Sequence, residues 1–195
     1  MKSRVFITLF LLICLSCSVW GQYDDGGRPI IFSKRTSGTI KVDGQLDDPV
    51  WQGVIPSSAF WQYFPADTIR ADQQTEIYMR YDDEYLYVAT KCYAAGADYV
   101  VPSLRRDYRA GGSDNITLVF DPFNDNTNAF VFGLNPFGVQ REALISNGGN
   151  NIPRDWDSSW DAKWEGDAQM YEDHWIAEFA IPFRSIRFKE GSTKW

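Results

Sequence analysis

The feature of this sequence that most constrains its fold is a series of short segments in which apolar and polar residues alternate. Within Thr75–Tyr81, Ile77 and Met79 share one side of an extended chain, and two aspartates at positions 82–83 then lead into Tyr85–Cys92. Alternation with a period of two is typical of half-buried strands, and a polar pair between two such segments favours a tight turn. The region therefore predicts an antiparallel β-hairpin.

Five later segments repeat this pattern, with Asp-Pro, Asn-Pro and Phe-Gly pairs among the breaks between them. They are Asn115–Asp121, Ala129–Asn135, Val139–Ser146, Asp161–Gln169 and His174–Ile181. No segment keeps a helical period, and Pro182–Ile186 suits one helical turn at most. Many short strands with regular turn signals predict an all-β fold, an antiparallel β-sandwich of the jelly-roll kind. The last two residues, Lys194 and Trp195, are typical of the start of a further strand, so we expect this sandwich to be truncated at its C-terminus.

The N-terminal residues are expected to lie outside this fold. Lys2 and Arg4 precede an apolar stretch, Val5–Leu15, which is too short to cross a bilayer, and Gly21 offers a small residue for cleavage. Residues 1–21 therefore predict a signal peptide. Residues 22–38 are polar and rich in glycine, and predict a flexible lead-in with a short edge strand at 30–32. The sandwich is expected to occupy residues 39–195.

The stretch Thr39–Val54 predicts how the sandwich begins. Its β-branched residues favour a strand at 39–42, which the turn dipeptide Asp43-Gly44 ends. Asp47 and Asp48 then offer N-caps for one helical turn that contains Pro49 and Trp51. We expect Trp51 to be buried, as well as Trp164 and Trp175, which lie within strand patterns.

Composition limits the chemistry. Without Lys2 and Arg4 the chain carries 17 basic and 26 acidic residues, a net charge of −9, which argues against nucleic acid as a partner and is compatible with neutral sugars and divalent cations. Cys92 is the one cysteine after the leader and is expected to be buried and inert. His174 is the one histidine, so Ser-His catalysis and His-based zinc sites have little support. Glycoside hydrolysis by two carboxylates stays open, because acidic residues are plentiful but no pair is marked by position.

The best candidate binding residues lie in the tryptophan-rich stretch Asp155–Trp164. Sugar binding requires flat aromatic faces together with planar polar groups. Trp156 and Trp160 lie in or beside a loop rich in glycine and asparagine, so either is a candidate platform or a core residue. Arg105, next to Arg106 and Asp107, is a candidate donor to sugar hydroxyls or carboxylates, with a surface ion-pair network as the alternative.

An oxygen-rich turn is the candidate metal site. Asp121 and Asp125 stand in the sequence DPFNDN, and Ca²⁺ prefers six to eight oxygen ligands. The alternative is that these carboxylates serve only the backbone of their own turn. No other cofactor is expected.

Five stretches together resemble the carbohydrate-binding module family 9 (CBM9) type of β-sandwich, in the variant found at the N-terminus of large Gram-negative outer-membrane proteins. They are Ile40–Trp51, Thr75–Val88, Asp114–Asp121, Phe130–Gly138 and Trp175–Phe188. In sugar-binding members of that family, two tryptophans enclose a terminal sugar. The resemblance places the first on the loop Asp107–Ser113, where Tyr108 is the sole aromatic residue. It places a sugar-binding glutamate near Thr117, and the second tryptophan beyond Trp195.

The resulting prediction is a non-catalytic carbohydrate-binding module of a larger exported cell-envelope protein, involved in glycan capture or carbohydrate catabolism. Its partners are an oligosaccharide or polysaccharide and a barrel-like C-terminal region of the same protein, in the periplasm, the outer membrane or at the cell surface. Tyr108 joins Trp156, Trp160 and Arg105 as the candidate sugar contacts. Two alternatives remain: an interaction domain without sugar affinity that docks on an outer-membrane barrel, and an accessory module of a glycoside hydrolase whose catalytic part lies elsewhere.

Overall fold

A computed structural model describes residues 30–66, 68–94, 98–189 and 191. The chain divides into one unit that ends at Ile30 and a second that begins at Ile31, and every strand of the described residues belongs to the second unit. The predicted signal peptide lies outside the described residues. Within the described part, no helix is long and apolar enough to cross a membrane.

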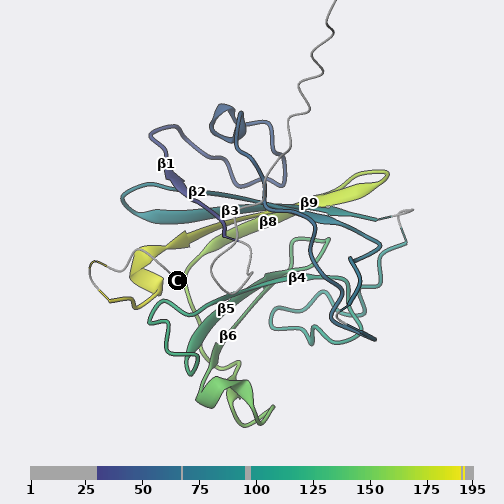
Figure 1. Ribbon diagram of the computed structural model, residues 1–195, viewed down its shortest axis with the longest axis vertical. Helices are drawn as coiled ribbons and strands as arrows, with labels where there is room; N and C mark the ends of the chain where they lie inside the picture. Colours follow the sequence, from purple (N-terminus) through teal and green to yellow (C-terminus); the bar gives the residue numbers. More distant parts are fainter. Residues whose placement is uncertain (1–29, 67, 95–97, 190, 192–195) are drawn as a thin grey trace, which may run out of the picture. The chain divides into compact units, whose positions relative to one another are not determined.

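The second unit is a sandwich of two sheets (Figure 1). The first sheet has the order β1-β2-β3-β9-β8. Its strands are β1 (Lys34–Arg35), β2 (Thr75–Tyr81), β3 (Tyr85–Tyr93), β9 (His174–Pro182) and β8 (Glu165–Met170). The second sheet has the order β4-β5-β6-β7. Its strands are β4 (Ile116–Phe120), β5 (Ala129–Leu134), β6 (Gln140–Ile145) and β7 (Trp156–Asp157). All pairings are antiparallel except that of β1 with β2. The predicted antiparallel β-sandwich is confirmed.

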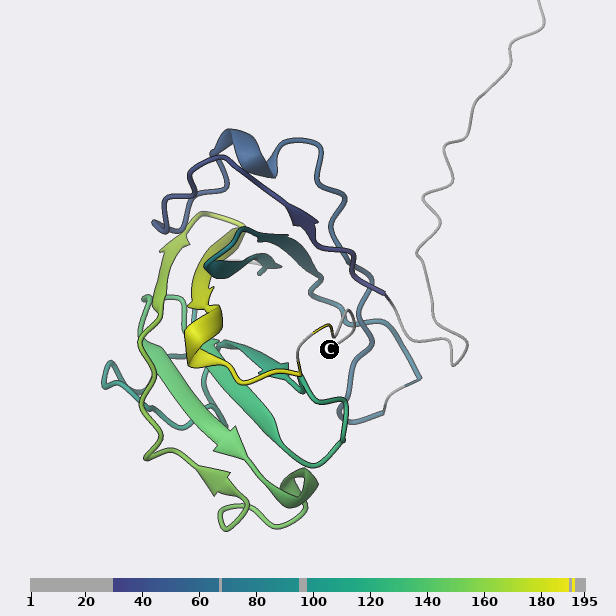
Figure 2. The same ribbon diagram turned by 90° about the vertical axis from the view of Figure 1, so that its left-hand side faces the viewer.

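The core fills the space between the sheets, seen edge-on in Figure 2. Trp164 joins the two layers, because its ring stacks on Phe179 of β9 at 5.6 Å and meets Phe132 of β5 edge-on at 5.4 Å. This position explains why β8 begins at Glu165 and not at the predicted residue 161: the chain crosses between the sheets and buries Trp164 on the way. Cys92 is buried in the same core, as predicted, and burial raises the pKa of its thiol to about 11.

The hairpin of β2 and β3 and the strands β4, β5, β6 and β9 confirm their predicted segments to within two residues at each end. Three short 3-10 turns complete the unit: η1 (Pro49–Trp51), η2 (Asn147–Gly149) and η3 (Phe183–Ser185). The predicted edge strand at 30–32 is wrong, since the edge strand is β1 at Lys34–Arg35. Strand β7, at Trp156–Asp157, was not predicted as a strand.

The segment between β1 and β2, called the covering segment below, covers the outer face of the five-stranded sheet (Figure 1). Glu178 of β9 is 1% exposed on that face, and its carboxylate accepts hydrogen bonds from the backbone N–H of Asp43 and of Gly44, each at 3.0 Å. The same carboxylate accepts the indole N–H of Trp51 at 3.2 Å. Trp51 is buried, as predicted.

This arrangement overturns two expectations about local structure. Residues 39–42 do not form a strand. The backbone N–H of Lys41 donates to the carboxylate of Asp48, and that of Asp43, directly after this range, donates to Glu178. Asp48 precedes η1 at the N-cap position, but its side chain accepts the N–H of Lys41 at 2.8 Å and makes no cap hydrogen bond. Pro49 does occupy the first helical turn.

Candidate functional site

A pocket of about 410 Å³ lies on the outer face of the four-stranded sheet, the face directed away from the core. The register places Thr117 of β4, Gly133 of β5 and Arg141 of β6 in one row across this sheet. Thr117 and Arg141 both line the pocket. Its volume falls within the range of roughly 300–1,000 Å³ that is usual for small-ligand sites.

Gly133 leaves the space that the Arg141 side chain occupies. A Cβ added at Gly133 would lie 2.7 Å from Cγ and 3.0 Å from Cδ of Arg141, closer than carbon atoms approach without displacement. A larger residue at position 133 would therefore push the arginine stem off the sheet. A glycine inside a strand often marks such a close approach.

The loop that precedes β4 forms one wall of the pocket, because it is bound to the edge of β6. The backbone N–H of Asp107 donates to the carbonyl of Gln140 at 3.1 Å, and the Asp107 carboxylate accepts the N–H of Glu142 at 3.3 Å. Asp107 has a φ of 59°, in the left-handed region that aspartate tolerates better than most residues. β7 pairs with β6 only at residues 144–145, so the loop takes the free edge before that point. Tyr108 is thereby held beside Arg141.

Arg141 is 7% exposed and lies between two aromatic rings. Its guanidinium carbon is 5.0 Å from the ring centre of Trp156 and 5.7 Å from that of Tyr108, both within cation–π range. Among the described residues the guanidinium makes no hydrogen bond and no ion pair. Burial lowers the pKa of the guanidinium, although arginine keeps its charge throughout the pH range of folded proteins.

Tyr108 adds a second polar group without a partner. Its ring is 5% exposed, so it offers no open stacking face, and its hydroxyl is buried with no hydrogen-bond partner among the described residues. Burial raises the pKa of this hydroxyl to about 12, which keeps it a neutral donor. Native interiors leave few polar groups unpaired, so two on one pocket wall require an explanation.

Trp156 reaches the pocket from β7, and the buried residue before it fixes that short strand. Asp155 is 3% exposed and accepts the N–H of Asn151 at 2.9 Å and the side-chain amide of Asn147 at 3.2 Å. These bonds tie the loop between β6 and β7 to its own end. Trp156 itself is half-buried and lines the pocket with Arg141.

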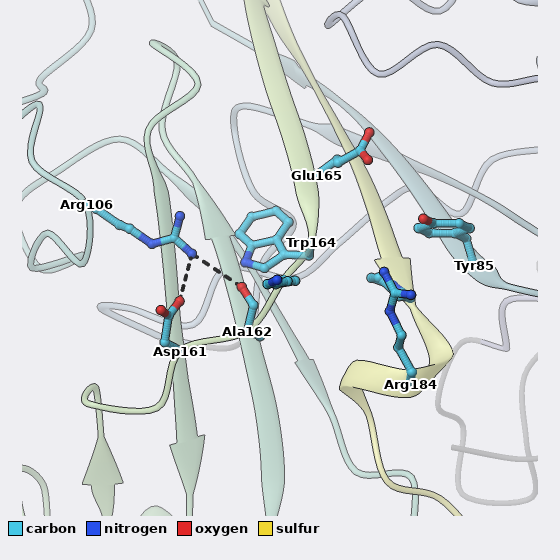
Figure 3. Close-up of a pocket in the computed structure, with 9 residues that line it drawn as sticks. Tyr85, Arg106, Asp161, Ala162, Trp164, Glu165 and Arg184 are labelled. Atoms are coloured by element: carbon cyan, nitrogen blue, oxygen red, sulfur yellow. Dashed lines mark hydrogen bonds and ion pairs between the residues drawn. The ribbon is translucent and has the colours of Figure 1, made fainter.

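A second pocket, of about 390 Å³, lies at the other side of the Arg106–Glu142 ion pair (Figure 3). Figure 3 shows Arg106 reaching Asp161 and the carbonyl of Ala162, with Trp164 beside them. Glu142 is 2% exposed and also accepts the indole N–H of Trp164 at 3.3 Å. Burial raises the pKa of Glu142, while Arg106 and Trp164 oppose that rise. The charges of Arg106 and Glu142 therefore satisfy each other within the chain.

The structure brings two of the predicted sugar contacts, Tyr108 and Trp156, to the first pocket and leaves the other two outside it. Trp160 is half-buried against the core, with Phe130 at 5.5 Å and Phe132 at 5.8 Å between ring centres. Arg105 is exposed and does not line the pocket, whereas its neighbour Arg106 carries the ion pair.

The predicted calcium turn uses its carboxylates on its own backbone. Asp121 accepts the N–H of Asp125 at 3.2 Å and of Asn126 at 2.7 Å, and Asp125 accepts the N–H of Thr127 at 2.7 Å. No group of three or more His, Cys, Asp or Glu side chains in the described part of the chain is placed to hold a metal ion. A calcium site at Asp121 and Asp125 stays a prediction.

Sequence reasoning missed Arg141 and Gly133, and it also missed Trp61. In the sequence, Arg141 is one of two adjacent charged residues in a predicted strand. A glycine in the neighbouring predicted strand, Gly133, was the one local indication that a side chain packs closely there. Trp61 is 55% exposed beside Tyr63, which is 93% exposed, and Phe64, which is 80% exposed. Arg70 covers the Trp61 ring at 4.2 Å.

Comparison with solved structures supports the fold assignment. The chain matches a proposed carbohydrate-binding protein from Bacteroides uniformis with a TM-score of 0.54 and 13% identity, over 78% of this chain and 72% of that one. The chain has a fold similar to that of CBM9 modules. A CBM9 module from Caldicellulosiruptor kristjanssonii in complex with glucose matches with a TM-score of 0.50 and 14% identity, over 76% of this chain and 67% of that one.

A structure of a CBM9 module from the same organism in complex with cellotriose matches at 15% identity and a TM-score of 0.49, over 77% of this chain. The chain spans 66% and 67% of the length of these two modules. No protein-family model and no curated protein matches the sequence significantly. At these identities the comparisons establish the CBM9-like fold.

Proposed function

We propose that this chain is a non-catalytic carbohydrate-binding module and that it binds sugar in the pocket between Tyr108, Arg141 and Trp156. The observation that carries the proposal is the position of this pocket. It is lined by the loop that starts at Asp107 and by Thr117, the two places where the CBM9 resemblance expects ligand contacts. The glucose-bound neighbour with a similar fold adds support.

The chemistry of the wall suits a sugar ring. Trp156 supplies an aromatic surface for the apolar C–H groups of a pyranose, and the planar guanidinium of Arg141 supplies several donors for its oxygens. Ser158 adds a hydroxyl group that donates and accepts, and the hydroxyl of Thr117, which already donates to Asn115 at 2.8 Å, can accept. A few polar groups among apolar surfaces are what fix the orientation of a small ligand.

Calorimetric titration of the purified protein with mono- and oligosaccharides tests the proposal. Trp156→Ala is expected to weaken binding at least about tenfold, a typical effect of removing an aromatic contact at the centre of a site. Trp61→Ala is the matched control, because Trp61 is an exposed tryptophan that does not line the pocket. Equal losses in both variants, or no binding by a broad glycan panel, would overturn the proposal.

We also propose that the protein is exported and that this module belongs to a larger cell-envelope protein, as its leader sequence and the resemblance suggest. Mass spectrometry of the protein purified from its native envelope fraction tests this. A mature N-terminus at Gln22 is expected, and an intact Met1 in a cytoplasmic fraction would contradict export.

One observation favours an interaction domain as the second candidate. Trp61, Tyr63 and Phe64 form an exposed aromatic cluster on the segment before β2, and large exposed apolar side chains that gather together often mark contact surfaces. This role predicts that Trp61→Ala and Tyr63→Ala reduce association with the rest of the protein and leave sugar binding unchanged. Co-purification of the separately expressed parts measures that association.

A further inference from the structure

Arg141 is a buried charge that forms no ion pair with any carboxylate of the described chain. Moving a guanidinium out of water without a partner is strongly unfavourable, and its contacts with Trp156 and Tyr108 offset only part of this through cation–π attraction. Folded proteins rarely keep such a group unless something else uses it. The pocket in front of Arg141 is the place from which a partner can reach it.

The acidic groups around the pocket are already engaged. Glu142 pairs with Arg106 and accepts the indole N–H of Trp164, and Asp107 accepts the backbone N–H of Glu142. Asp107 acts on Arg141 only through its more distant charge, without an ion pair. Arg109 adds a further positive charge to the lining. The lining thus holds two arginines and two carboxylates, and the carboxylate of Glu142 is already paired with Arg106, which lies outside the lining.

We propose that the ligand of this pocket is an acidic sugar, a uronic acid residue whose carboxylate pairs with Arg141. The inference rests on the proposed function and names the class of sugar. A carboxylate matches the planar fork of a guanidinium with two parallel hydrogen bonds, whereas a neutral hydroxyl offers one and leaves the charge uncompensated. The ring of Tyr108 lies beside Arg141 on the same wall.

The site is built to hold this arginine in place. Gly133 removes the side chain that would otherwise displace the Arg141 stem, and Trp156 and Tyr108 restrict the guanidinium from two sides. A restricted guanidinium loses little conformational freedom when a carboxylate binds, which favours affinity. Burial also strengthens the attraction, because the local dielectric constant is lower than that of water.

Titration with matched ligands is the test. The wild-type protein is titrated with oligosaccharides that end in glucuronic or galacturonic acid, with the methyl esters of the same sugars, with the neutral glucose and galactose counterparts, and with a sulfated counterpart. We expect the uronates to bind at least about tenfold more tightly than the esters and the neutral sugars, the effect of one strong charge-assisted pair. Acetate alone should compete poorly, because it lacks the ring that contacts Trp156.

Variants assign the effect to Arg141. Arg141→Gln is expected to abolish the preference for uronate over ester, and Arg141→Lys to reduce it, since lysine keeps the charge without the fork. Arg109→Gln is the matched control at an exposed arginine of the same lining, with an expected change of about twofold that high salt removes. Circular dichroism checks that each variant folds. If Arg141→Gln does not fold, the comparison of uronates with their methyl esters on wild-type protein still decides the question.

The outcomes separate this inference from the proposed function. If neutral sugars or esters bind as tightly as uronates, or sulfated sugars bind more tightly than uronates, the uronic acid inference is overturned while carbohydrate binding stands. If acetate competes as well as a uronate does, the pocket is only an adventitious anion site. If no sugar of any class binds, the proposed function falls, and this inference falls with it.

Discussion

Each of the two sheets buries a charged side chain on its outer face, but only one of the two charges has hydrogen-bond partners within the described chain. On the five-stranded sheet, Glu178 is covered by the segment before β2 and accepts three N–H groups, from Asp43, Gly44 and Trp51. On the four-stranded sheet, Arg141 is almost as deeply buried, yet among the described residues its guanidinium makes no hydrogen bond or ion pair and contacts the rings of Trp156 and Tyr108.

The contrast separates a structural charge from a candidate binding charge. The carboxylate of Glu178 binds donors that come from more than 120 positions earlier in the chain, so it holds the covering segment to the sheet. The side chain of Arg141 makes no hydrogen bond or ion pair to another part of the described chain, and it lines a pocket. Buried polar groups are normally paired, so a group paired by the fold serves the fold, and one left unpaired beside a pocket indicates a ligand.

Removal of the Glu178 side chain should have the largest effect on stability. Glu178→Ala leaves three donors, two of them buried, without an acceptor and creates a space beneath the covering segment, so we expect a loss of about 3–5 kcal/mol in the free energy of unfolding. Glu165→Ala, at an exposed glutamate of the neighbouring β8, is the control and should change it by less than about 0.5 kcal/mol. Urea unfolding measures both. Similar losses in the two variants would remove Glu178 from its structural role.

The same carboxylate predicts how stability depends on pH. Burial, with a contribution from the charge of Asp43, raises the pKa of Glu178 from 4.5 to about 7, while its N–H partners oppose the rise. The folded state therefore binds this proton more tightly than the unfolded state. The stabilisation is fully present below pH 4.5 and is lost as pH rises through about 7, by on the order of 3 kcal/mol.

Thermal unfolding of wild-type protein and Glu178→Gln between pH 5 and pH 8 checks this dependence, with the pH limits set at about two units below and one unit above that pKa. The difference between the two curves isolates the contribution of Glu178 from those of all other titrating groups. The wild-type melting temperature should fall more steeply with rising pH than that of the variant. Parallel curves would show that the three donors, and not burial, control the proton on Glu178.

Two glycines of the covering segment give a smaller, matched test. Gly44 and Gly53 have φ values of 74° and 69°, so backbone strain from alanine should destabilise the fold by a similar amount at each position, about 1 kcal/mol. A Cβ at Gly44 would also lie 2.5 Å from the backbone nitrogen of Gln169 and 2.7 Å from the carbonyl carbon of Ala168, whereas nothing lies within 4 Å of one at Gly53. We expect Gly44→Ala to cost about 1–3 kcal/mol more than Gly53→Ala by chemical denaturation. Equal costs would mean that the segment is not held closely against the sheet.

The sequence predicted the elements of the covering segment better than the bonds that hold it. The Asp43-Gly44 turn and the buried Trp51 followed from local chemistry, because turn propensity and the size of tryptophan do not depend on distant residues. Glu178 did not follow, since a glutamate in a strand is typical of a solvent-facing position until another segment covers that face. The wrong prediction of a strand at 39–42 has a related origin, because the carboxylate of Asp48 binds the N–H of Lys41, which a strand partner could otherwise use.

The candidate site was predictable only in part for a related reason. Alternation indicates that Arg141 and Glu142 point to opposite faces, but it does not indicate that both faces are covered. Trp156 and Trp160 lie four residues apart in one loop-like stretch, yet one faces the pocket and the other packs on Phe130 and Phe132. Local patterns cannot separate them, because the packing of β5 and β6 decides which ring is covered.

The smallest expected effect is the one that tests the comparison most directly. Arg141→Met keeps most of the side-chain stem and replaces the guanidinium with a thioether, which makes favourable contacts with the rings of Trp156 and Tyr108. Because the wild-type charge is buried without a partner, its removal should lower the free energy of unfolding by no more than about 1 kcal/mol, and a gain in stability is equally consistent with this reasoning. Urea unfolding beside Glu178→Ala provides the scale. A loss from Arg141→Met as large as that from Glu178→Ala would mean that Arg141 serves the fold, and the distinction between the two outer faces would fail.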